Sequence, residues 1–219
     1  MPTSGVTAWS LTALSFITSA LRRNGIISLS ETPTSEEIAE CLVVFNGILK
    51  SMPFGSYLLT TGTVIVPPGD PSGSLPAGVS DVISARVVMN ATYQRVLTRW
   101  GRSEYLEMPN KAQVGDPMAF YVDNQRDAVA MYVWPVPRDG ATLAIEYNRL
   151  PETITDSAQT VDFPERYNEY LGLELALNCA GLFGREPNPV LVARAGFLRQ
   201  QFEDDERPES YIIESGFNY

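Results

Sequence analysis

The chain has 219 residues, long enough for one sizeable domain or two small ones packed together. It carries 26 acidic and 16 basic residues, and this net charge of −10 makes it a poor general nucleic-acid binder, because neutralising phosphates requires Lys and Arg. It contains no histidine, which excludes Ser–His and Cys–His nucleophile pairs and the commonest transition-metal ligand.

The uncharged segment 6–21 places Leu14, Ile17 and Leu21 at helical spacing, and Asn24 and Gly25 end it well. The segment is shorter than the roughly 20 residues that span a bilayer. No Lys or Arg precedes it, as a signal peptide would require. We therefore expect a buried helix over residues 6–23.

A second helix is predicted after Pro33. Thr34 and Glu37 form a capping-box pattern, in which each side chain bonds the backbone N–H of the other residue. Apolar residues then follow at intervals of three and four, which indicates one apolar stripe; they are Ile38, Cys41, Leu42, Phe45, Ile48 and Leu49. Pro53 and Gly55 end the helix.

The middle of the chain changes character. Residues 61–80 are rich in Pro and Gly, which predicts a loop with at most a short strand at 63–66. Beyond Asp81 the apolar period becomes two, which predicts strands at 82–87, 119–122, 128–134 and 142–147. A short helix is expected over 100–110 with Ser103 as its N-cap. The arrangement is typical of a small antiparallel sheet or barrel.

Two helices are predicted near the C-terminus. The first begins with Asp162 as its cap and Pro164 in its first turn, and it ends at Gly184. The second opens at Asn188, and the short link between the two helices makes them antiparallel neighbours. The order of elements predicts an α+β fold with an antiparallel bundle of about four helices. Its parts are the bundle (1–60 and 160–207), a β-rich insertion with a Pro/Gly loop (61–159) and a C-terminal tail (208–219).

Cys41 and Cys179 both lie in apolar helical patterns. We interpret them as buried free thiols, since Cys behaves as a small hydrophobe in protein cores. A disulfide between them remains an alternative, because its formation depends on a geometry that the sequence does not give. No CxxC pair is present, so a zinc site has no support.

Three stretches in the middle of the chain, Glu104–Lys111, Gly115–Val122 and Tyr132–Pro137, resemble the middle of podovirus head-to-tail adaptors. These proteins are also called tail accessory factors or packaged-DNA stabilisation proteins. The likeness continues through residues 143–149 and 163–182 and ends in the turn at 184–189 and the helix that follows. It covers roughly residues 5–205, and the ordered combination of stretches carries it.

The resemblance implies a structural virion protein and not an enzyme, with no cofactor, no metal and no catalytic residue. It implies a ring of twelve copies that docks beneath the portal after DNA packaging and seals the DNA conduit. The expected partners are the portal protein and tail tube, nozzle or fibre proteins, while DNA passes without sequence-specific binding. The protein would be made in the bacterial cytoplasm and would end in the phage neck, without contact to a membrane.

Two alternatives remain open at this point. The first is another neck or tail ring, such as a head-completion or tail-tube protein. The second is a carboxylate-based cell-wall hydrolase, which would need two facing acids such as Glu165 with Glu169, or Asp204 with Glu206. Solvated helix faces are the simpler interpretation of both acid pairs.

Five basic residues alternate with aromatic ones in the central region and are candidates for an interface or a DNA-conduit face; they are Arg86, Arg95, Arg99, Arg102 and Lys111. The acidic total favours a solvated or subunit-facing surface over a nucleic-acid face. Trp134–Pro137 could form an aromatic ligand shelf. We favour a rigid strand end with Trp134 in the core.

The tail after Pro208 is unusually apolar for a chain terminus, since frayed ends are usually polar. Its large side chains are Tyr211, Ile212, Ile213, Phe217 and Tyr219. We predict a docking arm that contacts a neighbouring subunit or the portal. Packing against its own subunit is the alternative.

Overall fold

The computed structural model describes residues 9–52, 58–125 and 129–205. These residues form a mixed α+β protein with five α-helices and two four-stranded sheets, which confirms the predicted class. The chain divides into a helical unit, residues 1–56 and 152–219, and a β unit, residues 57–151. The sequence had suggested boundaries at 60/61 and 159/160.

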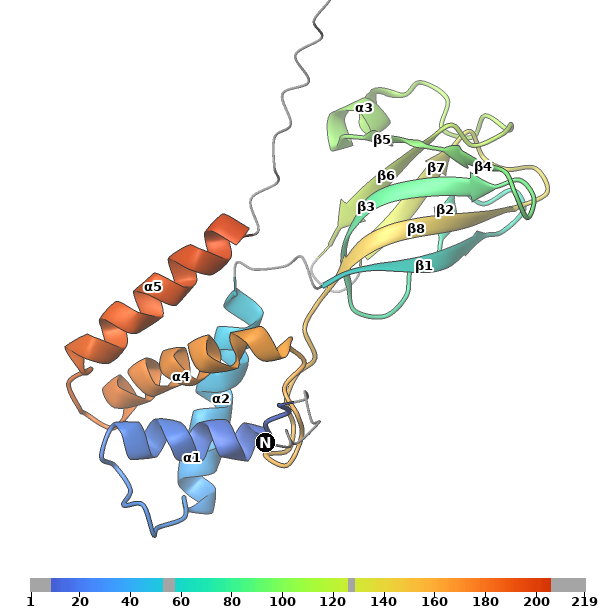
Figure 1. The fold of residues 1–219 in the computed structure, drawn as a ribbon. Coiled ribbons are helices and arrows are strands. Elements are labelled where there is room, and N and C mark those ends of the chain that lie inside the picture. The colour runs from blue at the N-terminus through green and yellow to red at the C-terminus, as the bar shows by residue number, and fades with distance from the viewer. Residues whose placement is uncertain (1–8, 53–57, 126–128, 206–219) are drawn as a thin grey trace, which may run out of the picture. The chain divides into compact units, whose positions relative to one another are not determined.

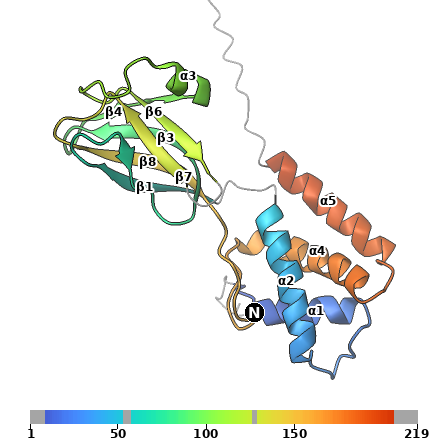
Figure 2. The ribbon, with the colours of Figure 1, turned by 180° about the vertical axis from the view of Figure 1, so that it is seen from behind.

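The helical unit is built around one central helix. Its elements are α1 (Ala13–Arg23), α2 (Ser35–Ser51), a 3-10 turn η2 (Glu165–Tyr167), α4 (Asn168–Leu182) and α5 (Pro189–Asp205). α4 contacts α1, α2 and α5 and buries residues all round its circumference, as a helix enclosed by others does. α1 and α4 lie side by side, and α2 crosses both (Figures 1 and 2).

The capping box of α2 is confirmed. Thr34 Oγ1 accepts a hydrogen bond from Glu37 N at 3.3 Å, and Glu37 Oε2 accepts one from Thr34 N at 2.8 Å. The residues of α2 that are fully buried are Cys41, Phe45 and Leu49, one for each turn. A stripe this narrow suits a crossing contact, so α2 does not run along its neighbours as it would in a simple antiparallel bundle.

α1 begins later than predicted, at Ala13, with Thr12 as its N-cap. Thr12 forms an isolated β-bridge with Thr160, and the N–H of Ala13 donates to the carbonyl of Gln159 at 2.9 Å. The segment before α1 is therefore extended, because it pairs with the loop that precedes α4. Residues 6–8 of the predicted helix lie outside the described residues.

The predicted cap of α4 is wrong. Asp162 accepts a hydrogen bond from Glu152 N at 3.0 Å, and α4 begins only at Asn168, after η2. Pro164 is extended, with ψ 143°, so it cannot belong to a helical first turn. The start of α5 is confirmed, since Asn188 Oδ1 accepts from Val190 N at 2.9 Å.

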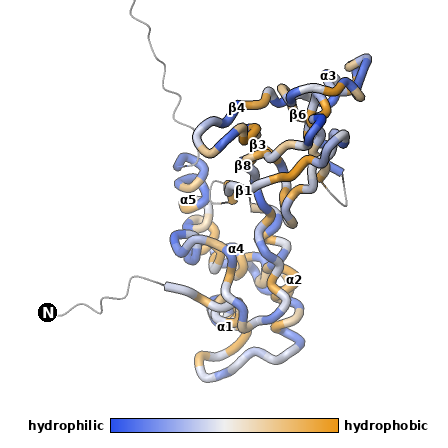
Figure 3. Tube along the Cα trace, turned by 90° about the vertical axis from the view of Figure 1, so that its right-hand side faces the viewer, coloured by the Kyte–Doolittle hydropathy of each residue, from blue (hydrophilic) through white to orange (hydrophobic). Residues whose placement is uncertain are grey.

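α5 contacts α4 through one face. Ala195, Leu198 and Phe202 are buried there, and Phe202 lies against Tyr167 with ring centroids 4.6 Å apart. Figure 3 shows α5 as a helix of mixed hydropathy. Its apolar residues are not all buried, because Phe197 is 59% exposed.

The β unit consists of two sheets that enclose a common apolar core. The strands are β1 (Leu59–Val66), β2 (Ser72–Gly73), β3 (Val79–Val88), β4 (Gln94–Val96), β5 (Thr98–Trp100), β6 (Ala119–Asn124), β7 (Val129–Trp134) and β8 (Ala141–Arg149). Their orders are β1-β8-β3-β4 and β2-β7-β6-β5. Val64, Val87 and Leu143 of the first sheet share a buried cluster with Phe120 and Met131 of the second.

The Pro/Gly segment contains more strand than predicted. β1 starts at Leu59 and runs for eight residues, and β2 lies inside the expected loop and pairs with β7. Gly73 permits this, because a Cβ at that position would overlap Val64 Cγ1. The turn that leads into β8 contains Gly140, whose positive φ of 80° is typical of a glycine at a turn.

The prediction of a wholly antiparallel β module is also corrected. β5 and β6 pair in parallel, and the connection between them, residues 101–118, is long enough for the crossover that parallel strands require. That connection contains α3 (Arg102–Glu107), which has Gly101 and not Ser103 as its N-cap. Glu104 Oε2 accepts a hydrogen bond from Gly101 N at 2.6 Å.

Candidate functional site

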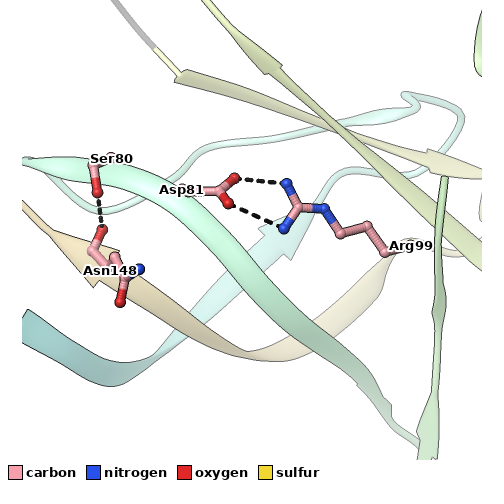
Figure 4. A network of polar contacts seen from close by, with 4 residues as sticks. All are labelled: Ser80, Asp81, Arg99 and Asn148. Carbon is pink, nitrogen blue, oxygen red and sulfur yellow. Dashed lines mark hydrogen bonds and ion pairs between the residues drawn. The ribbon is translucent and has the colours of Figure 1, made fainter. Parts of the chain in front are cut away.

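Arg86 and Arg99, two of the five basic candidates, are held by carboxylates on other strands of the β unit. Arg86 on β3 forms an ion pair with Glu146 on β8 at 3.1 Å, and Ser84 Oγ donates to the same carboxylate at 2.7 Å. The hydrogen bond from Ser84 and then the charge of Arg86 lower the pKa of Glu146. Arg99 donates two hydrogen bonds to Asp81, at 3.0 and 2.9 Å (Figure 4).

Arg102, Lys111 and Arg95, the other three, also have partners within the unit. Arg102 lies 3.7 Å from Asp123, and Lys111 Nζ donates to the carbonyl of Leu106 at 3.1 Å. Arg95 donates to the carbonyl of Pro117 at 2.7 Å, while its Nε is buried without a partner in the described structure.

The structure does not gather these residues into one patch. Arg99 and Arg102 line a hollow of about 450 Å³, and Arg95 lines a different one of about 700 Å³. Arg86 lines neither. Each of the five is already engaged by an internal acceptor. The role of these residues in an interface or a DNA-conduit face stays a prediction.

An aromatic cluster lies on the second sheet, and sequence reasoning missed it. Tyr105 of α3 stacks on Tyr121 and Tyr132, with ring centroids 4.8 and 5.6 Å away. Tyr121 and Tyr132 are directly opposite each other on β6 and β7. Their alternation with buried apolar residues was the signal that could have found the pair.

Trp134 is half-buried and not in the core, which corrects our interpretation of that strand end. Its ring lies 5.3 Å from that of Trp100, and its Nε1 donates to the carbonyl of Asn110 at 3.1 Å. The Trp134–Pro135 peptide bond is cis. These contacts pack the connection after α3 onto the sheet, so the tryptophan has a structural role whether or not the surface binds anything.

Glu165 and Glu169, the first of the two acid pairs, are each bound by other groups of the helical unit. Glu165 Oε1 accepts a hydrogen bond from Trp9 N at 2.7 Å, and Glu169 receives two from Arg194, both at 3.1 Å. The bond from Arg194 lowers the pKa of Glu169, whereas a general acid requires a raised one. Of the second pair, Glu206 lies outside the described residues.

Residues 9–52, 58–125 and 129–205 contain no group of three or more Cys, Asp or Glu placed to hold a metal ion. Among the same residues, no helix is long and apolar enough to cross a membrane. The tail residues Tyr211, Ile212, Ile213, Phe217 and Tyr219 lie outside the described structure.

Comparison with protein families gives one match, to the family model of the SU10 adaptor protein, over residues 12–207. The match spans the helical unit and the whole β unit. The chain belongs to the SU10 adaptor protein family. This is a family of phage head-to-tail adaptors, so the resemblance noted in the sequence is confirmed. No curated protein matches the chain.

Membership makes the chain a structural adaptor and a component of the phage virion, which interacts with other head and tail proteins. The family match runs through the whole β unit and through all of α1, α2, α4 and α5. All described residues from 12 onward therefore lie within the family match, and the residues after 207 lie outside it.

Proposed function

We propose that this adaptor forms a ring of twelve copies that joins the portal of the capsid to the tail and closes the DNA conduit after packaging. The match to the SU10 adaptor family over residues 12–207 carries the proposal. The portal protein lies on one side of such a ring, and a tail tube, nozzle or fibre protein on the other.

Exposed apolar side chains on both units support assembly. In the helical unit Val43 is 73% exposed and Val190 is 72% exposed. In the β unit Ile65 and Val96 are 69% and 67% exposed. A ring buries such side chains between subunits, where they add the apolar contact area that stabilises an oligomer.

The charge of the chain supports a conduit that DNA does not adhere to. The net charge is −10, and the five central basic residues are engaged by internal acceptors. These five residues are then less available to neutralise phosphates, which is the main source of non-specific DNA affinity. The same net charge makes like subunits repel, so we expect the isolated protein to be monomeric or weakly associated and to form a ring only on a portal template.

The tail after Pro208 is proposed as the docking arm. It carries Tyr211, Ile212, Ile213, Phe217 and Tyr219, and Glu214 is the one charged side chain within residues 211–219. Burying each large side chain contributes about 1.5–3 kcal/mol, partly offset by about 1–2 kcal/mol for each backbone residue that becomes ordered. The net gain of one arm is small, but a ring multiplies it, because neighbouring arms bind one partner together.

The proposal is tested by sedimentation with the purified portal ring. The chain alone should sediment as a small species, and with portal it should move to the portal fraction in a fixed ratio. Electron microscopy of the particle should then place it between portal and tail. A stable dodecamer without portal contradicts the template requirement, and a position elsewhere in the neck or tail makes it a head-completion or tube protein.

A further inference from the structure

The crossing of α2 over α4 brings together the two cysteines of the chain. Cys41 Sγ and Cys179 Sγ lie 3.5 Å apart, although the residues are 138 positions apart in sequence. Both side chains are fully buried, and both are free thiols. No third cysteine exists in the chain, so each thiol has the other as its sole partner for exchange within the molecule.

We propose that Cys41 and Cys179 form a site of oxidative modification, at which a small hydroperoxide converts the thiol pair to a disulfide that joins α2 to α4. The sulfur atoms are already in contact. Covalent bonding requires them to approach by about 1.5 Å, which side-chain torsions supply more readily than a movement of either helix.

The chemistry begins at Cys41. The hydrogen bond with Cys179 lowers the pKa of the Cys41 thiol, against the opposing effect of burial. The Cys41 thiolate attacks one oxygen of the peroxide and the O–O bond breaks, giving a sulfenic acid and, with the thiol proton, one water. Cys179 then attacks that sulfur, the S–O bond breaks, and a second water leaves. Two thiols and one hydrogen peroxide thus give one disulfide and two waters.

The pair is protected from competing reactions by its surroundings. Ala176 and Ala180 of α4 and Phe45 of α2 are fully buried within one helical turn of the two cysteines, and this apolar packing excludes large reagents. Hydrogen peroxide is close in size to water, so it needs a much smaller opening than a bulky disulfide reagent does. The thiols should therefore stay reduced in a thiol-rich cytoplasm and form the disulfide in oxidising surroundings.

The bond would close a loop that contains the whole β unit, since residues 57–151 lie between the two cysteines. A disulfide across so long a loop restricts the unfolded chain and should raise the melting temperature, by roughly 5–15 °C for a chain of this size. The rise should disappear when the bond is reduced with dithiothreitol.

The test uses the full chain in native buffer, with hydrogen peroxide as the probe. Thiols titrated after denaturation should fall from two to none, and the intact mass should fall by two hydrogens. A non-reducing digest should contain one joined pair of peptides, and the melting temperature should rise as stated. Retention of both thiols, a gain of oxygen in place of the loss of hydrogen, a disulfide-linked dimer, or an unchanged melting temperature would each overturn the proposal.

Cys41→Ala and Cys179→Ala are the matched controls. Each variant keeps one thiol, so peroxide should neither link peptides within the chain nor raise the melting temperature. Circular dichroism establishes that the variants are folded, and the mass measurement on the unsubstituted chain decides the question if they are not. Both cysteines lie in the helical unit, so the result is independent of whether the ring and portal proposal holds.

Discussion

Asn46 on α2 makes two hydrogen bonds with the backbone of Ile154. Its Nδ2 donates to the Ile154 carbonyl at 2.9 Å, and its Oδ1 accepts from the Ile154 N–H at 2.9 Å. The side chain of Ile154 is buried. This amide therefore attaches the segment that follows the β unit to the middle of a helix that precedes it.

Asn46→Ala should lower the free energy of unfolding by about 2–3 kcal/mol, because it removes both hydrogen bonds with Ile154 and the bonding partner of that residue's backbone groups. Urea denaturation measures the change. Asn178→Ala is the control: Asn178 is exposed and donates to Glu174 O at 2.8 Å, so the change there should stay below about 0.5 kcal/mol. Equal losses of unfolding free energy for the two substitutions would show that the contact with Ile154 does not stabilise the fold.

Phe45→Ala should cost about 3–5 kcal/mol, as the truncation of a buried aromatic side chain does. Phe45 is fully buried, and its ring lies 5.3 Å from that of Phe16. Val43→Ala, on the exposed side of the same helix, is the control and should leave stability nearly unchanged. A loss within experimental error for Phe45→Ala would contradict the packing of α2 described above.

Glu146→Gln should change how stability depends on pH. The pKa of Glu146 is lowered from 4.5, first by Ser84 and then by Arg86, so its carboxylate stabilises the folded chain above the ordinary glutamate pKa. That contribution is lost as the pH falls through the lowered value. The variant should be less stable than the unsubstituted chain at pH 7, and the difference should narrow below about pH 5.

Urea midpoints at pH 7, 5, 4 and 3 measure this narrowing. Ser84→Ala provides a second reading, since it keeps the carboxylate but removes the hydrogen bond that lowers its pKa most. Ser84→Ala should therefore show part of the loss of stability at pH 7 that Glu146→Gln shows. A difference between Glu146→Gln and the unsubstituted chain that is constant across the pH range would refute the assignment.

DNA affinity should be very weak. With a net charge of −10 and internal acceptors for Arg86, Arg99 and Lys111, we expect a Kd for duplex DNA weaker than about 10⁻⁴ M at physiological salt. Fluorescence anisotropy with a labelled duplex measures it. Lys111→Met should leave the signal unchanged; micromolar binding that this substitution weakens would instead support a nucleic-acid face.

Deletion of residues 209–219 should leave the melting temperature nearly unchanged and abolish sedimentation with the portal ring. The reason is that Pro208 cannot continue a helix, so the tail is expected to lie outside the fold of its own subunit. Calorimetry and portal sedimentation on the same preparation measure the two effects. Unfolding or aggregation of the shortened chain would place the tail in its own core, and unchanged portal binding would end the docking-arm proposal.

Features that depend on neighbouring residues could be predicted from the sequence. The bonds between Thr34 and Glu37, and between Asn188 and Val190, span two or three positions, so residue types alone indicate them. The positive φ of Gly140 follows from the turn composition in the same way.

Features that depend on distant residues could not be predicted. Asp162 resembles a helix cap, but its partner is Glu152, ten positions earlier. Arg99 resembles a free cation on a basic strand, but Asp81 binds it from another strand. In both cases a tertiary partner, which no local pattern encodes, overrides the local preference of the residue.

The division of the chain also determines the order in which its parts can form during synthesis. The β unit is continuous, so all its strands exist once residue 151 has left the ribosome. The helical unit is split, and α1 and α2 have no α4 to pack against until residue 182 has been made. Domains generally fold as units as they emerge. The β unit can thus fold while the two N-terminal helices, which were translated first, still lack the central helix of their core.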